Sequence, residues 1–123
     1  LDQIDEQLPY LREALARTPT APLTLHGQLD KVAREVARLR EQLSGHPVRA
    51  RLSEFDRPSA ASRLYHAAGS LFTRLAPTAT QRRSLELGRS NLEAVEHGIE
   101  RLQQDALTAL EDTLAEAGAP WTP

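Results

Sequence analysis

Apolar residues recur along most of the chain at intervals of three and four, the spacing that places side chains on one face of an α-helix. The clearest run covers residues 25–43, and its members are Leu25, Leu29, Val32, Val36, Leu39 and Leu43. This narrow seam is typical of helices that pack as in a coiled coil. Thr24 is a candidate cap for the start of this helix, and Gly45 followed by Pro47 predicts its end.

A second stretch with helical spacing lies at the beginning of the chain. Its apolar positions are Ile4, Leu8, Leu11 and Leu15. Pro9 falls inside this pattern and should kink or break a helix, because proline lacks a backbone N–H and its ring clashes with the preceding turn. We therefore expect this helix to begin near Leu8 and to stop before Pro19 and Pro22.

A third helix is expected to start at Ser59, a capping residue directly after Pro58, and to end at Pro77. Its apolar face consists of Ala61, Leu64, Ala68, Leu71 and Leu75, with Tyr65 and Phe72 on a flank. Before this helix, residues 48–58 have a weaker pattern. They are expected to form either one or two helical turns or a loop packed by its own apolar residues, Val48, Leu52 and Phe55.

The last helical stretch begins at Thr78 or Thr80 and continues without proline to about Ala117. Its seam is Leu85, Leu92, Val95, Ile99, Leu102 and Ala106, followed after a small phase shift by Leu107, Leu110 and Leu114. Gly88 and Gly98 should each weaken the helix by about 1 kcal/mol relative to alanine. Gly118 is the expected stop, since glycine commonly follows the last helical residue.

Composition favours the same fold class. Aromatic residues make up only 4% of the chain, so any core must be built from Leu, Val and Ala. No run of β-branched residues alternates with polar ones as in a half-buried strand. Apolar stripes on helices must face one another, and short connections join antiparallel neighbours. We expect an all-α, antiparallel up-and-down bundle of about four helices, with residues 1–123 forming a single domain.

Charge and cysteine content exclude several classes of function. The formal net charge is −2, and the basic residues are interspersed with acidic ones, so no nucleic-acid partner is expected. The chain has no cysteine, which removes disulfides, thiolate zinc sites and cysteine nucleophiles. No apolar run approaches the roughly 20 residues that span a bilayer. These features leave the cellular compartment open.

The first residues indicate how the chain relates to its gene product. Residues 1–7 carry three acidic groups and no basic one, which is the wrong charge for a signal peptide. The chain also begins with Leu1 instead of methionine. We interpret it as a piece of a longer polypeptide or a processed one.

Candidate chemistry is sparse. The four histidines are His26, His46, His66 and His97, and the last lies in a cluster with Glu93, Glu96 and Glu100, of which Glu93 and Glu100 share its helical face. This trio is a possible metal site, but the neighbouring apolar seam predicts that it faces solvent. No nucleophile turn, paired-carboxylate cleft or glycine-rich phosphate loop is present. We expect no catalytic residue, no metal site and no cofactor.

Three aromatic residues are the candidates for interaction. Tyr65 and Phe72 lie two helical turns apart and fit core positions or a contact surface. Trp121 lies between Pro120 and Pro123, beyond the last expected helix. It either folds back onto the bundle or anchors a neighbouring domain or subunit, since tryptophan is favoured at contact hot spots.

The C-terminal half has a recognisable pattern. Residues 76–81 read Ala-Pro-Thr-Ala-Thr-Gln before the long helix, and residues 118–123 read Gly-Ala-Pro-Trp-Thr-Pro after it. With these features, residues 64–123 resemble the C-terminal helical region of large bacterial β-propeller proteins of the BNR-repeat or sortilin-like glycosyl hydrolase type. The resemblance implies an excised module of a larger protein whose hydrolase activity, if any, resides in the missing propeller.

Two functional hypotheses follow. In the first, the chain is a non-catalytic module that docks on its parent propeller or associates with itself. In the second, it is a bundle that binds a small molecule or a metal through His97 and its carboxylates. The parent is expected to be periplasmic or secreted if the resemblance holds, and the substrate of the parent is left open.

Overall fold

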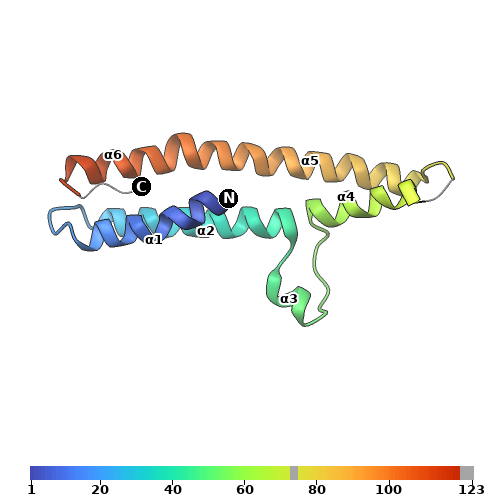
Figure 1. The fold of residues 1–123 in the computed structure, drawn as a ribbon, viewed down its shortest axis with the longest axis horizontal. Coiled ribbons are helices and arrows are strands. Elements are labelled where there is room, and N and C mark those ends of the chain that lie inside the picture. The colour runs from blue at the N-terminus through green and yellow to red at the C-terminus, as the bar shows by residue number, and fades with distance from the viewer. Residues whose placement is uncertain (73–74, 120–123) are drawn as a thin grey trace. The chain divides into compact units, whose positions relative to one another are not determined.

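The computed structural model describes residues 1–72 and 75–119, and this part of the chain contains helices and no strand. The elements are α1 (Asp2–Ala16), α2 (Thr24–Ser44), α3 (Pro47–Arg51), α4 (Ala60–Ala68), the 3-10 turn η1 (Gly69–Phe72), α5 (Ala79–Arg101), the π-helical segment η2 (Leu102–Leu107) and α6 (Thr108–Glu116) (Figure 1). The backbone from α5 to α6 is helical without a break. The prediction of an all-α helical bundle that ends in a long helix is confirmed.

The chain divides into two compact units. The first combines Leu1–Arg38 with the chain from Gly98 onward, and the second is Leu39–His97. In the first unit α1, the beginning of α2 and α6 run alongside one another (Figure 1). Its fully buried aliphatic side chains include Ile4, Leu11, Leu25, Leu29, Val36 and Leu110. The predicted α2 seam is therefore the centre of a real core, in which the described buried side chains are all aliphatic apart from Thr18.

Helix α1 differs from the expectation at Pro9. The helix begins at Asp2 and continues through Pro9, instead of beginning near Leu8. An interior proline costs about 3 kcal/mol. The turn before it places Ile4 and Leu8 in the core, only 1% and 7% exposed, and each buried side chain of this size contributes about 1.5–3 kcal/mol. Burial of these two residues thus offsets the proline, whose own ring lies on the exposed face.

The phase shift in the last helix has a structural cause. The segment Leu102–Leu107 is π-helical, with one extra residue per turn. Leu102 and Leu107, five residues apart, are consequently both buried, and the Thr108 hydroxyl donates a hydrogen bond of 2.9 Å to the carbonyl of Gln103. The sequence indicates the shift of the seam near Ala106, and the π segment is how the backbone accommodates it.

In the second unit α4 packs closely on α5 at Gly88. A β-carbon at this glycine would lie 2.9 Å from Leu64 Cδ2 and 3.3 Å from the β-carbon of Arg63. A larger residue at this position would have to displace the side chain of Leu64. The sequence predicts a close approach through the small residues of α4, whereas this contact uses a glycine of its partner helix.

The helix ends match most of the predicted signals. The Ser59 hydroxyl accepts a hydrogen bond from the Ser62 amide, and Gly45 and Gly118 both adopt positive φ. Thr78 and Gln81 exchange side-chain to backbone hydrogen bonds of 3.2 and 2.9 Å, which form a capping box at the start of α5. The start of the last helix near Thr78 is thus confirmed.

The third helix is shorter than expected. Regular helix stops at Ala68 instead of reaching Pro77, and the 3-10 turn follows. Leu71 and Leu75 are 81% and 78% exposed. Because no facing apolar surface covers these side chains within the described residues, nothing compensates for the weak helix propensity around Gly69.

Replacing Pro9 by alanine tests the helix through this position. We expect Pro9→Ala to raise the free energy of unfolding by about 1–3 kcal/mol, because it restores a helical hydrogen bond and removes the ring clash. Urea denaturation followed by circular dichroism measures the change. Pro19→Ala is the control, since Pro19 lies in the turn after α1 and its replacement should not stabilise the chain. Equal effects would show that α1 does not continue through Pro9.

The two glycines Gly27 and Gly88 should respond to alanine in opposite directions. An added β-carbon at Gly27, in α2, meets nothing within 4 Å. Gly27→Ala should therefore raise the free energy of unfolding by about 0.5–1 kcal/mol. Gly88→Ala should lower it by about 1 kcal/mol, because the overlap with Leu64 outweighs the gain in helix propensity. Thermal unfolding of both variants decides the matter, and a stabilised Gly88→Ala would contradict the close approach.

Candidate functional site

The histidines do not converge on a metal site. The described residues contain no group of three or more His, Asp or Glu side chains that could hold a metal ion. The His97 ring lies on its own helix, with Nδ1 2.7 Å from the backbone oxygen of Glu93. His26 and His66 are exposed. The alternative of a metal site at Glu93, His97 and Glu100 thus finds no supporting geometry in this part of the chain.

His46 has a structural role at the start of α3. Its Nδ1 accepts hydrogen bonds from the amides of Val48 and Arg49, at 3.2 and 3.4 Å, and so caps this short helix. Pro47 at the first helical position needs no such partner. The cap fixes the direction in which the chain leaves α2.

Asp56 closes the segment that begins at His46. Its Oδ2 accepts from the His46 amide at 2.8 Å, and its Oδ1 accepts from the Arg57 amide at 2.8 Å and from the Arg49 guanidinium at 3.3 Å. The carboxylate therefore joins the two ends of residues 46–57, a segment we call the α3 hairpin. Gly45 enters it with φ +89°, a conformation that favours glycine.

The same hydrogen bonds shift the acidity of Asp56. The backbone N–H of His46 is the main cause that lowers the pKa of Asp56 below its ordinary value of 3.8, and the Arg57 amide and the Arg49 charge act in the same direction. Partial desolvation opposes them without reversing the direction. Asp56 is therefore ionised at neutral pH and holds the hairpin through charge-assisted hydrogen bonds.

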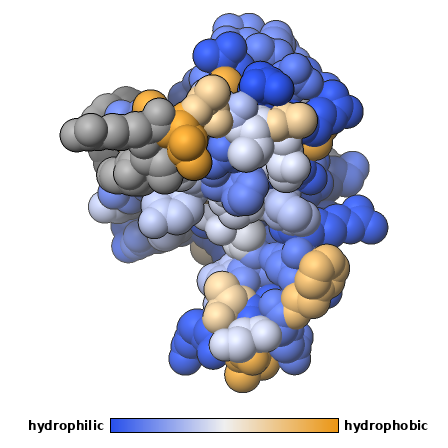
Figure 2. All heavy atoms as spheres, turned by 90° about the vertical axis from the view of Figure 1, so that its right-hand side faces the viewer, coloured by the Kyte–Doolittle hydropathy of each residue, from blue (hydrophilic) through white to orange (hydrophobic). Residues whose placement is uncertain are grey.

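The α3 hairpin exposes large apolar side chains. Val48, Leu52 and Phe55 are 52%, 63% and 90% exposed, and α3 has no buried residue. Figure 2 shows orange, hydrophobic atoms on the lower part of the surface in that view. Of the two alternatives expected for residues 48–58, the packed loop is not found, because the hydrogen bonds to Asp56 hold the backbone while these three side chains are exposed. The expected helical turn does form, as α3.

The three predicted interaction residues have different outcomes. Tyr65, on α4, is 81% exposed, so its interpretation as a core residue is wrong. Phe72 lies in η1, and its side chain is outside the described part of the structure. Trp121 also lies outside the described residues. An interaction role for the three stays a prediction.

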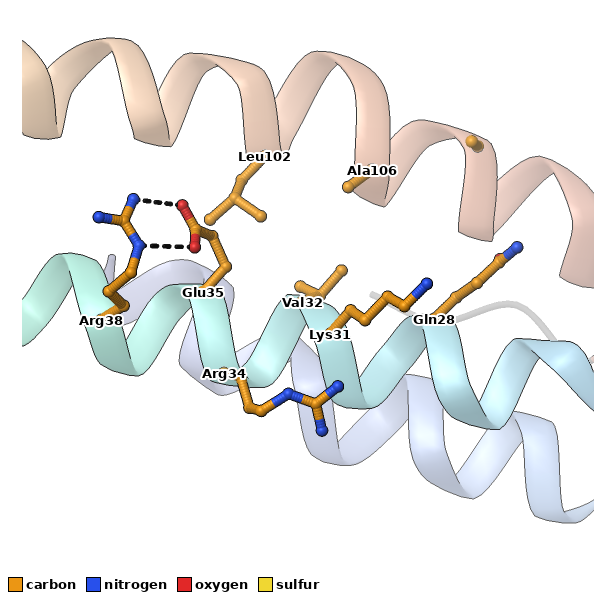
Figure 3. A pocket seen from close by; sticks show the side chains of 9 residues that line it. Gln28, Lys31, Val32, Arg34, Glu35, Arg38, Leu102 and Ala106 are labelled. Atoms are coloured by element: carbon orange, nitrogen blue, oxygen red, sulfur yellow. Dashed lines mark hydrogen bonds and ion pairs between the residues drawn. The ribbon is translucent and has the colours of Figure 1, made fainter.

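A groove lies in the first unit, between α2 and the segment of η2 and α6 (Figure 3). Its volume is about 650 Å³. Val32, Leu102, Ala106 and Ala109 form its apolar floor, and Gln28, Lys31, Arg34, Glu35 and Arg38 of α2 form one edge. The small alanines leave room for a partner on the η2–α6 side of the groove. An apolar floor beside a charged edge suits an amphipathic partner.

One ion pair organises the charged edge. Arg38 donates to Glu35 through Nε at 2.7 Å and through Nη2 at 2.5 Å, a bidentate arrangement drawn in Figure 3. The hydrogen bond from Arg38 is the main cause that lowers the pKa of Glu35, and the carboxylate raises the pKa of Arg38 in return. Lys31 and Arg34 make no ion pair or hydrogen bond with the described residues. Their charges are therefore available at the edge.

Neither the groove nor the α3 hairpin is predicted as a binding surface by the sequence pattern. The alternation of Glu35 with arginines predicts a solvated outer face, and helical spacing does not reveal that the neighbouring helix leaves a groove there. For the α3 hairpin a signal exists: Phe55 and Asp56 lie between two prolines, Pro47 and Pro58, in a short segment whose helical pattern is weak. Such a segment has few means of burying a phenylalanine.

The helices of the described residues include none long and apolar enough to cross a membrane. Comparison with protein-family models, with curated proteins and with solved structures finds no match for this chain. The resemblance of residues 64–123 to β-propeller proteins accordingly stays an expectation.

Acid should open the α3 hairpin. The folded pKa of Asp56 is lowered, so its contribution to hairpin stability is fully present above the ordinary value of 3.8 and is lost as the pH falls through the lowered value. We expect the His46 and Arg57 amides, corrected for intrinsic exchange, to lose protection from hydrogen exchange over this range. Asp56→Asn should reduce their protection already at neutral pH. Asp30→Asn, which removes the exposed pair with Arg12, is the control and should leave both amides unchanged. Full protection in Asp56→Asn would show that the hydrogen bonds to the Asp56 carboxylate do not hold the hairpin closed.

Proposed function

We propose that the chain is a non-catalytic helical module that docks on another protein domain through its α3 hairpin. The observation that carries the proposal is the exposure of Val48, Leu52 and Phe55 on a backbone held by Asp56. Burying a phenylalanine or leucine contributes about 1.5–3 kcal/mol each. Three such side chains held together form a natural centre for a contact.

The rigidity of the hairpin supports docking. Association is weakened by the entropy lost when loops become ordered at the interface. The hydrogen bonds from His46 and Arg57 to Asp56 fix the hairpin before any partner arrives. An exposed phenylalanine in a segment with several arginines is also the composition that is enriched at binding hot spots.

The resemblance of the C-terminal half suggests which partner to test first. In β-propeller proteins of this type a propeller precedes the helical region, so we propose a propeller domain of the same polypeptide as the docking partner. The predicted contact residues Tyr65, Phe72 and Trp121 belong to the same proposal. Any catalytic activity would then lie in the partner.

Substitutions in the hairpin test the proposal. Binding of this chain to the remainder of its parent polypeptide, produced separately, is measured by isothermal titration calorimetry. We expect Leu52→Ser with Phe55→Ser to weaken binding at least about 10-fold, because two exposed apolar anchors are lost. The matched control is Leu23→Ser, at a leucine that is 85% exposed in the first unit.

Circular dichroism should show the wild-type fold in both variants, since neither replaces a buried residue. Unchanged affinity of the hairpin variant, or no binding by the wild type, would overturn the proposed docking.

A further inference from the structure

The groove of the first unit has unlike charges on its two sides. Lys31, Arg34 and Arg38 follow α2 at i, i+3 and i+7, along one edge. Asp105 and Asp112 lie four residues before and three residues after Ala109, and so share its side of the opposite helix. Both aspartates are exposed, and neither side chain makes an ion pair or hydrogen bond with the described residues. The α2 edge is therefore mainly cationic, with Glu35 paired to Arg38, and the η2–α6 side has these two aspartates, with Arg101 one turn before Asp105.

A surface with this arrangement is complementary to itself. We propose that the groove face is the contact of a homodimer, in which α2 of one copy lies over α6 of the second. A two-fold axis parallel to the helices produces this pairing and sets the cationic edge of each copy against the acidic side of the other. An axis perpendicular to the helices would instead place α2 of one copy over α2 of the second. Lys31 and Arg34 would then face the same residues of the other copy, and like charges repel. Charge therefore selects one of the two symmetric arrangements.

The floor of the groove fits the same occupant. Ala106 and Ala109 are small and allow another helix to approach closely, and Val32 and Leu102, only 4% and 6% exposed, add narrow apolar edges beneath it. The result is four helices, two from each copy, around a shared apolar layer with charged flanks, as at the flanking positions of a coiled coil. A small ligand is less suited to this site, because small-molecule pockets enclose most of their ligand and this groove is open along one side.

The dimensions set the strength of the contact. From Gln28 to Arg38 the groove follows α2 for about 15 Å at 1.5 Å per residue. Such a face is smaller than the roughly 800 Å² per partner of a standard stable interface. The dimer is accordingly weak and reversible, with a dissociation constant in the micromolar to millimolar range, and it dissociates more readily in high salt.

Charge reversal tests the dimer, because two variants that each weaken association should associate with one another when mixed. Sedimentation equilibrium from about 10 μM to about 1 mM should show the wild type dimerising within this range. Lys31→Glu with Arg34→Glu makes both sides acidic, and Asp105→Lys with Asp112→Lys makes both sides basic. Each variant alone should dimerise at least about 10-fold more weakly. An equimolar mixture should restore association, because every edge then faces its opposite.

Two further variants test whether dimerisation depends on the groove face and not on the net charge of the chain. Glu93→Lys with Glu96→Lys changes the net charge as much as the aspartate variant, but in the second unit, and should dimerise like the wild type. Ala109→Gln places a neutral, bulky side chain on the floor at an exposed position and should weaken the dimer. Circular dichroism checks that each variant is folded.

The inference does not depend on the α3 hairpin, and the measurements separate the two. Phe55→Ser should leave dimerisation unchanged. A wild type that is monomeric up to about 1 mM would overturn the inference, as would a mixture that associates no better than its components. Loss of the dimer in Phe55→Ser with no effect of charge reversal would also overturn it, and would assign self-association to the hairpin.

Discussion

The burial of one-sided aliphatic stripes is the interaction on which this structure depends. The chain has no cysteine and few aromatic residues, and among the described residues the buried apolar side chains are leucine, valine and isoleucine with two alanines. Where stripes meet, even unfavourable backbone features are accepted: α1 continues through Pro9, and the last helix widens into a π turn so that Leu102 and Leu107 are both buried. Where the described residues leave a stripe exposed, as at Leu71 and Leu75, regular helix has already stopped. Local helix propensity is secondary to whether a facing surface exists.

This dependence explains which parts of the fold could be predicted. The α2 seam, the end of that helix at Gly45 and the long last helix follow from spacing and capping chemistry, which are local properties of the sequence. The course of α1 through Pro9 and the early end of α4 depend on what lies opposite each helix, and a single sequence does not contain that information. Gly88 is intermediate: its cost to the helix is visible in the sequence, but the reason for it, contact with Leu64, is visible only in the structure.

The candidate surfaces were harder to predict for the same reason. A sequence shows that Val48, Leu52 and Phe55 are apolar and does not show whether anything covers them. The bond between the His46 amide and Asp56 joins residues ten positions apart, and it forms because the chain returns after α3. On α2, the pattern identifies Lys31 and Arg34 as surface residues. Whether that surface is solvated or borders a groove is decided by the phase of η2 and α6, which the π segment sets.

The connection between α2 and α4 argues that the α3 hairpin is more than a link. Helices in bundles are usually joined by about 2–8 residues, and structureless connections longer than about 12 are uncommon unless they have a function. Here residues 45–59 intervene, with a capped helix, a carboxylate clasp and three exposed apolar side chains. A connection that served only stability would be short and polar. The hairpin instead combines a fixed backbone with exposed apolar side chains, a combination suited to a lasting contact, whereas the groove has charged edges, which suit a contact that salt can reverse. The two surfaces therefore differ in the kind of association that their chemistry supports.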